Sequence, residues 1–409
     1  MNKKLFLSIA AALLCAWTAF SQDYGLTLRS LLVLSNGDKP YGNFDYTGSA
    51  VPWFSAPLGT QGDLYLSGGI SAVYSDSEWK AVPEVYRFEA SYRFGSGMSL
   101  EAGRLSYRDP LNMVMNGLFD GIAFNAGLGN TRLSAGAFYT GLLYKKTAYI
   151  TMSPGDYDDY SDQDVYFASR RLVFSLAWEI PDLFDTEGIL NLGLTGQFDL
   201  NDPEDLLPAD EIDGGVKIHS QYASAKFTLP FLNYFNAELK ALLGITEETG
   251  LDPGLCFAFS GGAAWLPPGA LNDRLSLNAA LSSGARGSTA RAFLSINTIG
   301  QGKVLRPKLS GLALVEGAYN ARLHQSLSAE VSAAYFFRTD THTYGDSELD
   351  KTSLSPLLGG EVYGSLNWAP VSDISFILGG GAFFPQLGKS FATDASLRWR
   401  VSLETTLSF

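Results

Sequence analysis

The last stretch of the chain alternates between apolar and polar residues with a period of two. From Leu397 the odd positions are apolar except for one threonine: Leu397, Trp399, Val401, Leu403, Thr405, Leu407 and Phe409. The even positions between them are polar: Arg398, Arg400, Ser402, Glu404, Thr406 and Ser408. Successive side chains of a β-strand point to opposite faces, so the pattern predicts a strand with one apolar face. A membrane barrel and the edge of a soluble sandwich both contain such strands. An exposed apolar edge promotes aggregation, which favours the barrel.

Similar segments, separated by turn signals, recur along the chain. We expect strands at 24–34, 64–74, 84–94, 98–107, 118–127, 131–142, 167–179, 189–199, 217–228, 236–244, 254–264, 272–283, 290–298, 307–318, 323–338, 358–368, 373–383 and 395–409. Single-chain bacterial barrels have an even number of strands, and these eighteen segments agree with that rule. In such barrels short turns and long loops should alternate along the chain, because they lie at opposite ends of the barrel. The expected strands break this alternation at 35–63 and at 299–306. Either 41–48 is an additional strand and a later segment is not a strand, or one loop is shorter than expected.

Charged residues on the polar faces of these strands are candidates for the lining of a wet lumen. They are Arg87, Glu89, Arg93, Glu101, Arg104, Arg108, His324, Glu330, Arg398, Arg400 and Glu404. Arg104 and Arg108 turn inward only if Gly103 breaks the register with a bulge, as glycines within strands often do. Closure of the barrel is expected to bring Arg398 and Arg400 beside Arg29. These charges either sort solutes by their own charge or only neutralise one another within the wall.

The long connections are acidic. The acidic residues that we expect on external loops are Asp156, Asp158, Asp159, Asp162, Asp164, Asp202, Glu204 and Asp205, and 340–350 carries four more. Carboxylates can bind calcium, but the ordered spacing of a calcium loop is missing, so we predict no metal site. Solvated loops that attract cations toward the mouth are the favoured interpretation.

The start of the chain has the features of a secretory signal. Lys3 and Lys4 precede a short apolar run, and small residues follow it, so we expect cleavage after Ser21. Cleavage removes two lysines and moves the formal charge from −13 to −15. Cys15 leaves a lipoprotein signal open as an alternative, although Leu14 precedes it where a small residue is required. Cys256 is the other cysteine, so the mature chain forms no internal disulfide.

Several functional classes lack support in the sequence. After residue 21 no apolar run approaches 18 residues, which argues against a helical membrane protein. The negative charge and the absence of basic runs argue against nucleic acid as a partner. The three histidines, His219, His324 and His342, lie in none of the usual hydrolase or metalloprotease motifs. We therefore expect neither an enzyme nor a cofactor.

The closing strand resembles the terminal strand of outer-membrane β-barrel proteins of diderm bacteria. In that family the assembly machinery recognises such a strand, and the matching residues here are Trp399, Val401, Leu403, Leu407 and Phe409. The segment 103–121, which contains Arg108-Asp109-Pro110, also resembles a strand-loop-strand pattern of substrate-selective porins and polysaccharide-export barrels. That resemblance covers some twenty residues. It implies that 109–118 folds into the lumen.

Together these features predict an all-β protein, a single antiparallel transmembrane β-barrel of about 16–18 strands over residues 22–409. We expect a porin-like outer-membrane channel, exported by the secretory pathway, for passive diffusion of small hydrophilic solutes. The alternative is a closed or plugged barrel whose acidic loops bind a ligand or a host surface. Expected partners are outer-membrane lipid, the barrel assembly machinery and the solutes, and homo-oligomerisation remains open.

Overall fold

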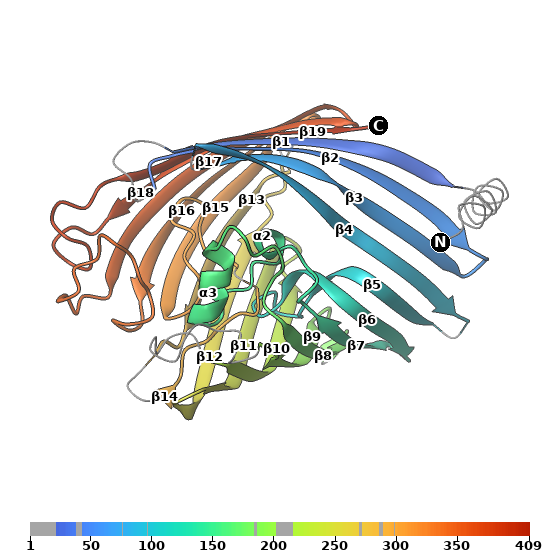
Figure 1. The fold of residues 1–409 in the computed structure, drawn as a ribbon, viewed down its shortest axis with the longest axis horizontal. Coiled ribbons are helices and arrows are strands. Elements are labelled where there is room, and N and C mark those ends of the chain that lie inside the picture. Colours follow the sequence, from blue (N-terminus) through green and yellow to red (C-terminus); the bar gives the residue numbers. More distant parts are fainter. Residues whose placement is uncertain are drawn as a thin grey trace.

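A computed structural model describes residues 22–37, 43–75, 77–95, 97–183, 186–201, 216–269, 272–285, 289–297 and 299–409. The expected signal peptide at 1–21, including Cys15, lies outside these ranges. The structure is a curved sheet closed into a ring, with loops and two short helices crossing its interior (Figure 1).

The elements follow one another as antiparallel hairpins along most of the chain. The strands are β1 (Asp23–Ser35), β2 (Asn43–Leu58), β3 (Gly62–Ser75), β4 (Glu78–Phe94), β5 (Met98–Arg108), β6 (Asn116–Leu128), β7 (Thr131–Tyr139), β8 (Arg171–Ile180), β9 (Ile189–Asp199), β10 (Ile218–Phe231), β11 (Phe235–Glu248), β12 (Asp252–Trp265), β13 (Arg274–Ser282), β14 (Thr289–Ala290), β15 (Leu312–His324), β16 (Leu327–Arg338), β17 (Leu357–Val371), β18 (Ile374–Pro385) and β19 (Arg398–Ser408). The helices within the described residues are α2 (Lys145–Ala148) and α3 (Pro154–Ser161).

The barrel closes because β1 pairs with both β2 and β19. The short β14 pairs in parallel with β12 and is not part of the wall, where β13 pairs directly with β15. Eighteen strands therefore form the closed wall, and all of their pairings are antiparallel. This confirms the predicted fold class and strand number.

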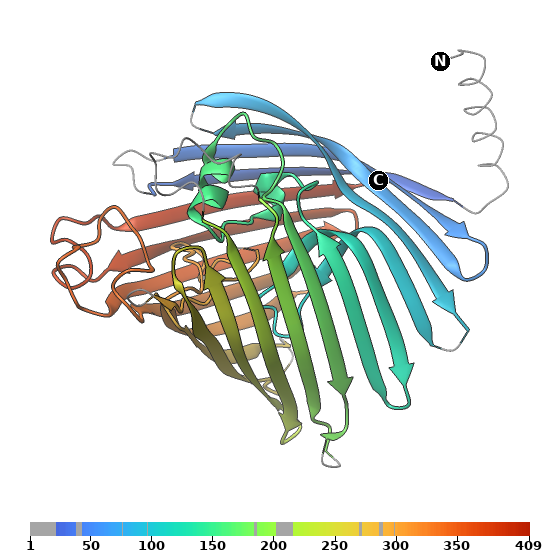
Figure 2. The same ribbon diagram turned by 60° about the horizontal axis from the view of Figure 1, so that its bottom comes forward.

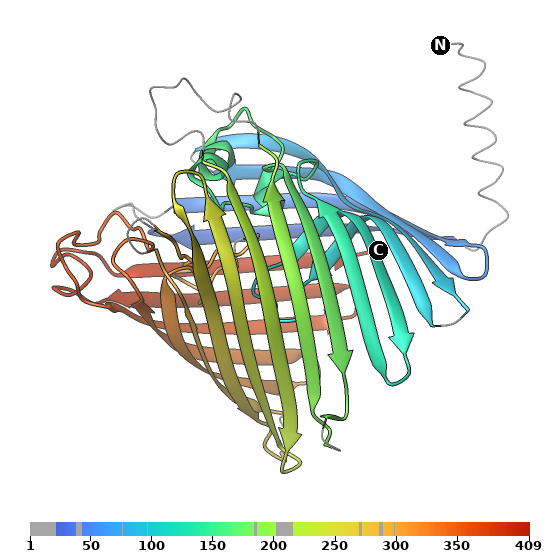
Figure 3. The ribbon, with the colours of Figure 1, turned by 90° about the horizontal axis from the view of Figure 1, so that it is seen from below.

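Short turns join the strands at one end of the barrel, and most long connections lie at the other end (Figures 2 and 3). In transmembrane barrels of bacteria the short turns face the periplasm and the long loops face outward. Both β1 and β19 have their free ends on the short-turn side, where Phe409 exchanges backbone hydrogen bonds with Leu26.

The outer face of the wall is apolar over its middle. Leu239, Leu243, Leu277, Val331 and Val362 are among the large apolar side chains exposed there. Aromatic clusters lie at two levels, Tyr46, Tyr74 and Trp79 toward the long loops and Phe231, Phe235 and Trp265 toward the short turns. An apolar band between two aromatic belts is the surface that a bilayer requires of a barrel. No helix in the described ranges has the length and apolarity to cross a membrane.

Two strand predictions need correction. β2 was missing from the expected strands, because Gly48 and Pro52 interrupt its alternation, although 41–48 had been considered as an additional strand. The segment 290–298 is not a wall strand. Its apolar residues are buried inside the barrel, where Phe293 and Ile296 pack against other loops.

The ladder between β4 and β5 is incomplete. Residues 88–94 of β4 pair with 98–104 of β5, whereas 78–87 pair only with β3. Side chains close this opening: Arg104 donates hydrogen bonds to the carbonyls of Val85 and Leu142, and the Tyr166 hydroxyl donates to the carbonyl of Pro83. Pro83 suits an unpaired edge because it has no N–H to leave without a partner.

Candidate functional site in the barrel lumen

Two parts of the luminal wall differ in what covers them. We call β5–β13 and β15–β18 the covered wall, and β19 with β1–β4 the bare wall. Three connections fold onto the covered wall: the first inward segment (109–115), the second (140–170) and the third (283–311). Among the described residues, the main buried apolar cluster takes members from the covered wall, from these connections and, with Phe391, from the 386–397 connection, and none from the bare wall.

The first inward segment is organised by Asp109, which directly follows β5. Its carboxylate accepts hydrogen bonds from the backbone N–H groups of Leu111, Met113, Val114 and Met115, at 2.6–3.1 Å. Burial raises the pKa of Asp109, although the four N–H groups oppose this rise. The cluster of donors turns the chain back on itself, so the segment packs its apolar side chains inside the barrel.

The first segment extends across the lumen. The Pro110 ring lies 3.3 Å from the place that a Cβ atom would take at Gly193 on β9, so the segment packs closely against that strand. The expected inward loop at 109–118 agrees with the structure for 109–115, whereas 116–118 belong to β6.

Ile296 and Asn297 of the third segment join it to the first and second inward segments and to the start of β6. The Oδ1 of Asn297 accepts a hydrogen bond from the N–H of Asn116 at 3.3 Å, and its Nδ2 donates to the carbonyl of Ala148 at 2.7 Å. Beside it, the N–H of Ile296 donates to the carbonyl of Val114 at 2.9 Å. Asn297 is 3% exposed, so these bonds form away from bulk water.

A second tie between segments comes from a lysine. The Nζ of Lys308 in the third segment donates to the carbonyl of Thr151 in the second, at 2.7 Å. Burial lowers the pKa of Lys308, and the nearby Asp156 carboxylate opposes that shift. The inward segments are therefore joined to one another as well as to the wall.

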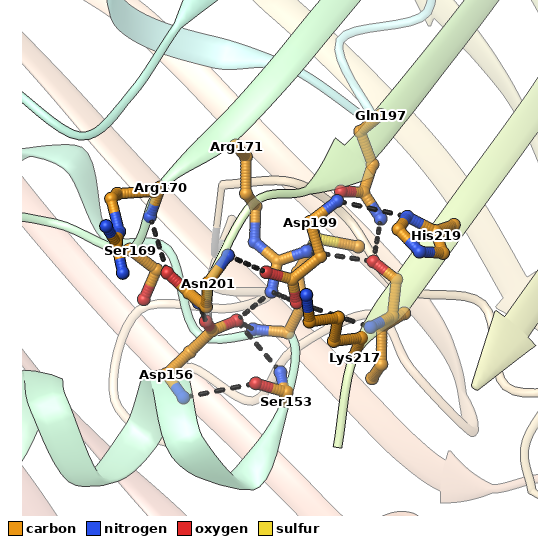
Figure 4. Close-up of polar contacts among 12 residues, drawn as sticks. Ser153, Asp156, Ser169, Arg170, Arg171, Gln197, Asp199, Asn201, Lys217 and His219 are labelled. Carbon is orange, nitrogen blue, oxygen red and sulfur yellow. Dashed lines mark hydrogen bonds and ion pairs between the residues drawn. The ribbon is translucent and has the colours of Figure 1, made fainter. Parts of the chain in front are cut away.

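The second inward segment is fixed to the wall by Arg171, the first residue of β8 (Figure 4). Arg171 has no exposed surface, and its guanidinium donates to Asp156 at 2.6 Å and to Asp199 at 3.0 Å. It also donates to Gln197 Oε1 and to the carbonyl of Ile218.

Asp156 has a further role in the local structure of α3. Its carboxylate accepts from the N–H of Ser153, and its own N–H donates to the Ser153 hydroxyl, which forms a capping box at the helix start. Pro154 occupies the first turn, where no N–H is needed. Asp156, the third residue of α3, therefore both takes part in the cap of the helix and holds the helix against β8 and β9.

The third segment is held by a carboxylate on the wall. Glu361 of β17 accepts hydrogen bonds from the N–H groups of Lys303, Val304 and Leu305. Gly302 before them has a φ of +74°, and an added Cβ would meet the Phe336 ring at 2.6 Å. Only glycine allows the chain to pass this point without strain.

The outer loops are also tied to the wall by an ion pair. Arg398, the first residue of β19, donates to Asp346 at 2.6 Å and to Glu348 at 2.9 Å. Its charge is neutralised by these loop carboxylates, and its side chain is 9% exposed. Arg398 is thus an anchor for the 339–356 connection.

The inward face of the bare wall carries the apolar residues Leu31, Val33, Val51 and Val73. Its other inward positions are mostly polar and lie outside the main apolar cluster. They include Thr27, Arg29, Asp45, Thr47, Ser49, Arg87, Glu89, Arg400, Ser402, Glu404 and Thr406. Arg87 pairs with Glu89 and lies over the Tyr65 ring. Arg400 is within electrostatic range of Arg306 and Tyr149 from the inward segments and of Asp45 on β2. Glu101 on β5 faces Arg87 and Glu89.

The register corrects one expected neighbourhood. Arg29 is opposite Thr406, whereas Arg400 is opposite Ser35, six residues farther along β1. Arg29 therefore does not lie beside Arg398 or Arg400. Arg29, Arg400 and Glu404 form no ion pair with another described residue.

The bulge predicted at Gly103 is absent, because the pairing of β5 with β4 and β6 continues through it without a shift. Leu105 keeps an inward position, so Arg104 and Arg108 belong to the opposite face of the strand. Arg104 pairs with Asp120 at 2.8 Å. Gly103 has another role: with φ at +120°, a Cβ there would meet the Phe88 carbonyl oxygen at 1.9 Å.

Other predicted luminal residues lie at the ends of strands or against the third inward segment. Arg93 is exposed at the short-turn rim, 3.9 Å from Asp63. His324 ends β15 and contacts Ser326 within the turn. Glu330 is 3.7 Å from Lys303.

One acidic residue of the long connections is buried, although all of them were expected on solvated loops. Asp156 is buried in the Arg171 network, whereas Asp158, Asp162 and Asp164 are exposed and Asp159 is half-buried. Burial raises the pKa of Asp159, with a contribution from the Asp156 charge. Asp202, Glu204 and Asp205 lie outside the described residues. Within the described ranges, no group of three or more His, Cys, Asp or Glu residues could hold a metal ion.

The sequence contained only partial signals for these anchors. Asp109 precedes a proline, a common turn signal, and was recognised as part of an inward loop. Arg171, Asn297 and Glu361 were missed because each acts on a segment far away in sequence.

Solved structures with the same fold include three proteins of Pseudomonas aeruginosa, of which OprD is an outer membrane protein. OpdQ has a TM-score of 0.61 at 11% identity, over 95% of this chain and 99% of that chain. OprD has a TM-score of 0.57 at 13% identity, over 95% and 94%. OccK2 (OpdF), solved in complex with glucuronate, has a TM-score of 0.60 at 12% identity, over 95% and 97%. No family model matches the chain, and no curated protein matches its sequence.

At these identities the likeness establishes the fold alone, which is a closed outer-membrane-type β-barrel. Combined with the apolar band and the closed ladder, this fold places the chain in a bacterial outer membrane.

Proposed function

We propose that the protein is a channel for the passive diffusion of small hydrophilic solutes, and that solutes pass between the bare wall and the inward segments. The observation that carries this proposal is the absence of the main apolar cluster from the described residues of the bare wall. Water solvates such a wall, because its hydroxyl and charged groups have no apolar cover. Diffusion along it needs neither a catalytic residue nor a cofactor.

Charges of both signs face this route. Arg29 and Arg400 are cationic, Asp45 and Glu404 are anionic, and Arg306 approaches from the third inward segment. Opposed charges across a narrow aqueous route produce a local field that discriminates between solutes. The glucuronate complex of OccK2 (OpdF), a protein of the same fold, is consistent with a small hydrophilic solute.

We also propose that residues 1–21 are removed on export and that the closing strand is the signal for barrel assembly. Trp399, Val401, Leu403, Leu407 and Phe409 would form that signal before closure, since in the finished barrel β19 is paired on both sides.

The test is single-channel conductance in a planar lipid bilayer, with two adjacent threonines as a matched pair. Thr406 faces the lumen and Thr405 faces the lipid. We expect discrete open steps from the wild-type protein, a lower conductance for Thr406→Trp and an unchanged conductance for Thr405→Trp. Equal conductance in both variants would refute the route along the bare wall. A folded barrel without any open steps would refute the channel and support the ligand-binding alternative.

A further inference from the structure

A cavity of about 330 Å³ lies between the covered wall and the inward segments. We call it the alcove. Its lining comes from β11, β12, β13 and β15, from Leu111–Met113 of the first inward segment, and from the third inward segment. None of the described residues that line it belongs to the bare wall, so it is separate from the proposed route of diffusion.

The charged groups around the alcove neutralise one another. Glu238 pairs with Lys226 at 2.9 Å and with Lys240 at 2.7 Å. Lys303 is 3.7 Å from Glu330 and also faces Glu316. The formal charges of these six residues cancel. Among the described residues Glu316 forms no ion pair within 4 Å, but the six formal charges sum to zero, so a solute with a net charge would place an uncompensated charge in the alcove.

In contrast, the neutral polar groups of the alcove have free hydrogen-bonding capacity. The side chains of Asn112, Ser260, Asn278 and Ser295 form no hydrogen bond with any described residue. Each amide offers two N–H donors and one carbonyl acceptor, and each hydroxyl can both donate and accept. Such a mixture matches the hydroxyl groups of a polyol, which also donate and accept.

Small residues create the space. Gly261, Gly262, Gly300 and Gly302 are part of the lining. A Cβ atom at Gly262 would lie 2.2 Å from Oδ1 of Asn278, so glycine is required for the amide to lie flat against β12. The volume is near the lower limit of small-molecule sites, which suits one six-carbon molecule.

We propose that the alcove is a binding site for a neutral polyhydroxyl solute of about six carbons, a sugar alcohol or a monosaccharide. This rests on the proposed channel function and gives it a substrate class. A solute held beside the route is concentrated in the lumen, while the charges of the bare wall act on ions.

The test uses three probes of similar size and different charge: sorbitol, gluconate and glucamine. Saturation-transfer NMR on the detergent-solubilised barrel measures binding without requiring conduction. We expect sorbitol to bind, and both charged analogues to bind with dissociation constants about tenfold higher. A factor of about ten corresponds to the free energy of one lost or unpaired hydrogen bond.

Asn278→Leu removes an amide from the alcove, and Asn367→Leu is the matched control. Asn367 is an inward-facing residue of β17 that does not line the alcove. We expect about tenfold weaker sorbitol binding for Asn278→Leu and no change for Asn367→Leu. Heat-modifiable migration on gels establishes that both variants are folded.

The outcomes separate this inference from the channel proposal. Equal sorbitol binding by wild type and Asn278→Leu, or stronger binding of either charged analogue, would overturn the alcove site even if the protein conducts. Selective sorbitol binding by a barrel that shows no conductance would support the alcove and refute the channel.

Discussion

The bare and covered walls share one backbone ladder and one alternation of faces, but they differ in what their inward residues contact. On the covered wall, Leu242, Ala258 and Leu312 are fully buried beneath the inward segments. At equivalent positions of the bare wall, Ser49 and Thr406 lie beside charged residues and have no such cover. The alternation of a strand thus shows which residues face inward, whereas the loops decide whether that face is dry or wet.

The two walls also use charge differently. On the covered side, buried ions have several partners each: Arg171 donates to two carboxylates, and Asp109 and Glu361 each accept several N–H groups. On the bare wall, Arg29 and Arg400 have no ion-pair partner among the described residues. The first kind of charge fixes the loops in place, and the second is free to act on a solute.

The largest effect on stability is expected from removing Arg171, which holds the second inward segment against the covered wall. Arg171→Met leaves Asp156 and Asp199 buried without a counterion, which typically costs about 3–5 kcal/mol. We expect a corresponding fall in the free energy of unfolding, measured by denaturant titration in detergent.

The control for that variant removes the stranded charges as well. The triple variant Arg171→Met, Asp156→Asn, Asp199→Asn contains no uncompensated buried charge, so most of the lost stability should return. If Arg171→Met is as stable as the wild type, the ion network does not hold the second inward segment.

The next effect concerns the joint between the three inward segments. Asn297→Ala leaves the buried carbonyl of Ala148 unpaired, which costs about 1–3 kcal/mol, and removes the acceptor of the half-buried N–H of Asn116. We expect the segments to loosen and the open-channel current noise to rise. Asn367→Ala, which removes a luminal amide without hydrogen bonds, should leave the noise unchanged, and a similar rise in both variants would contradict the role of Asn297.

Reversing charges on the bare wall should change the free energy of unfolding only slightly. It should change the ion selectivity of the channel clearly. The double variant Arg29→Glu, Arg400→Glu should shift the reversal potential in a salt gradient toward cations, with stability changed by no more than about 0.5 kcal/mol. Arg93→Glu at the exposed rim should shift it less, because salt screens that position. An identical shift in both would show that surface charge alone determines selectivity.

The smallest effect is a pH dependence of the outer loop. Burial tends to raise the pKa of Glu348, but hydrogen bonds from Arg398 and Ser396 lower it below its usual value. A carboxylate with a lowered folded-state pKa stabilises the fold above its unfolded pKa and loses this contribution as pH falls through the folded value. We expect faster proteolysis of the 339–356 connection in acid, and a weaker pH dependence in Glu348→Gln. Identical pH profiles would exclude Glu348 as the titrating group.

The sequence predicted the wall well because lipid and barrel closure impose a strict period of two. Leu403 and Arg398 lie on opposite faces of β19, as their alternation indicated. The sequence predicted the lumen less well. The third inward segment contains apolar residues that are buried, such as Phe293 and Ile296, and a short buried loop of this kind has the same apolar pattern as a strand. The prediction of a bulge at Gly103 was wrong for another reason. The glycine is needed there because the backbone of Phe88 passes too close for a side chain.

The most direct test of a wet bare wall and a dry covered wall is cysteine accessibility. In a Cys256→Ala background, single cysteines replace Thr406 on the bare wall, Ala258 on the covered wall and Thr405 on the lipid face. A charged, water-soluble thiol reagent is then added while single-channel current is recorded. We predict rapid modification and a reduced current for Thr406→Cys, and no change for Ala258→Cys or Thr405→Cys. Rapid modification at Ala258→Cys with no effect at Thr406→Cys would contradict the account.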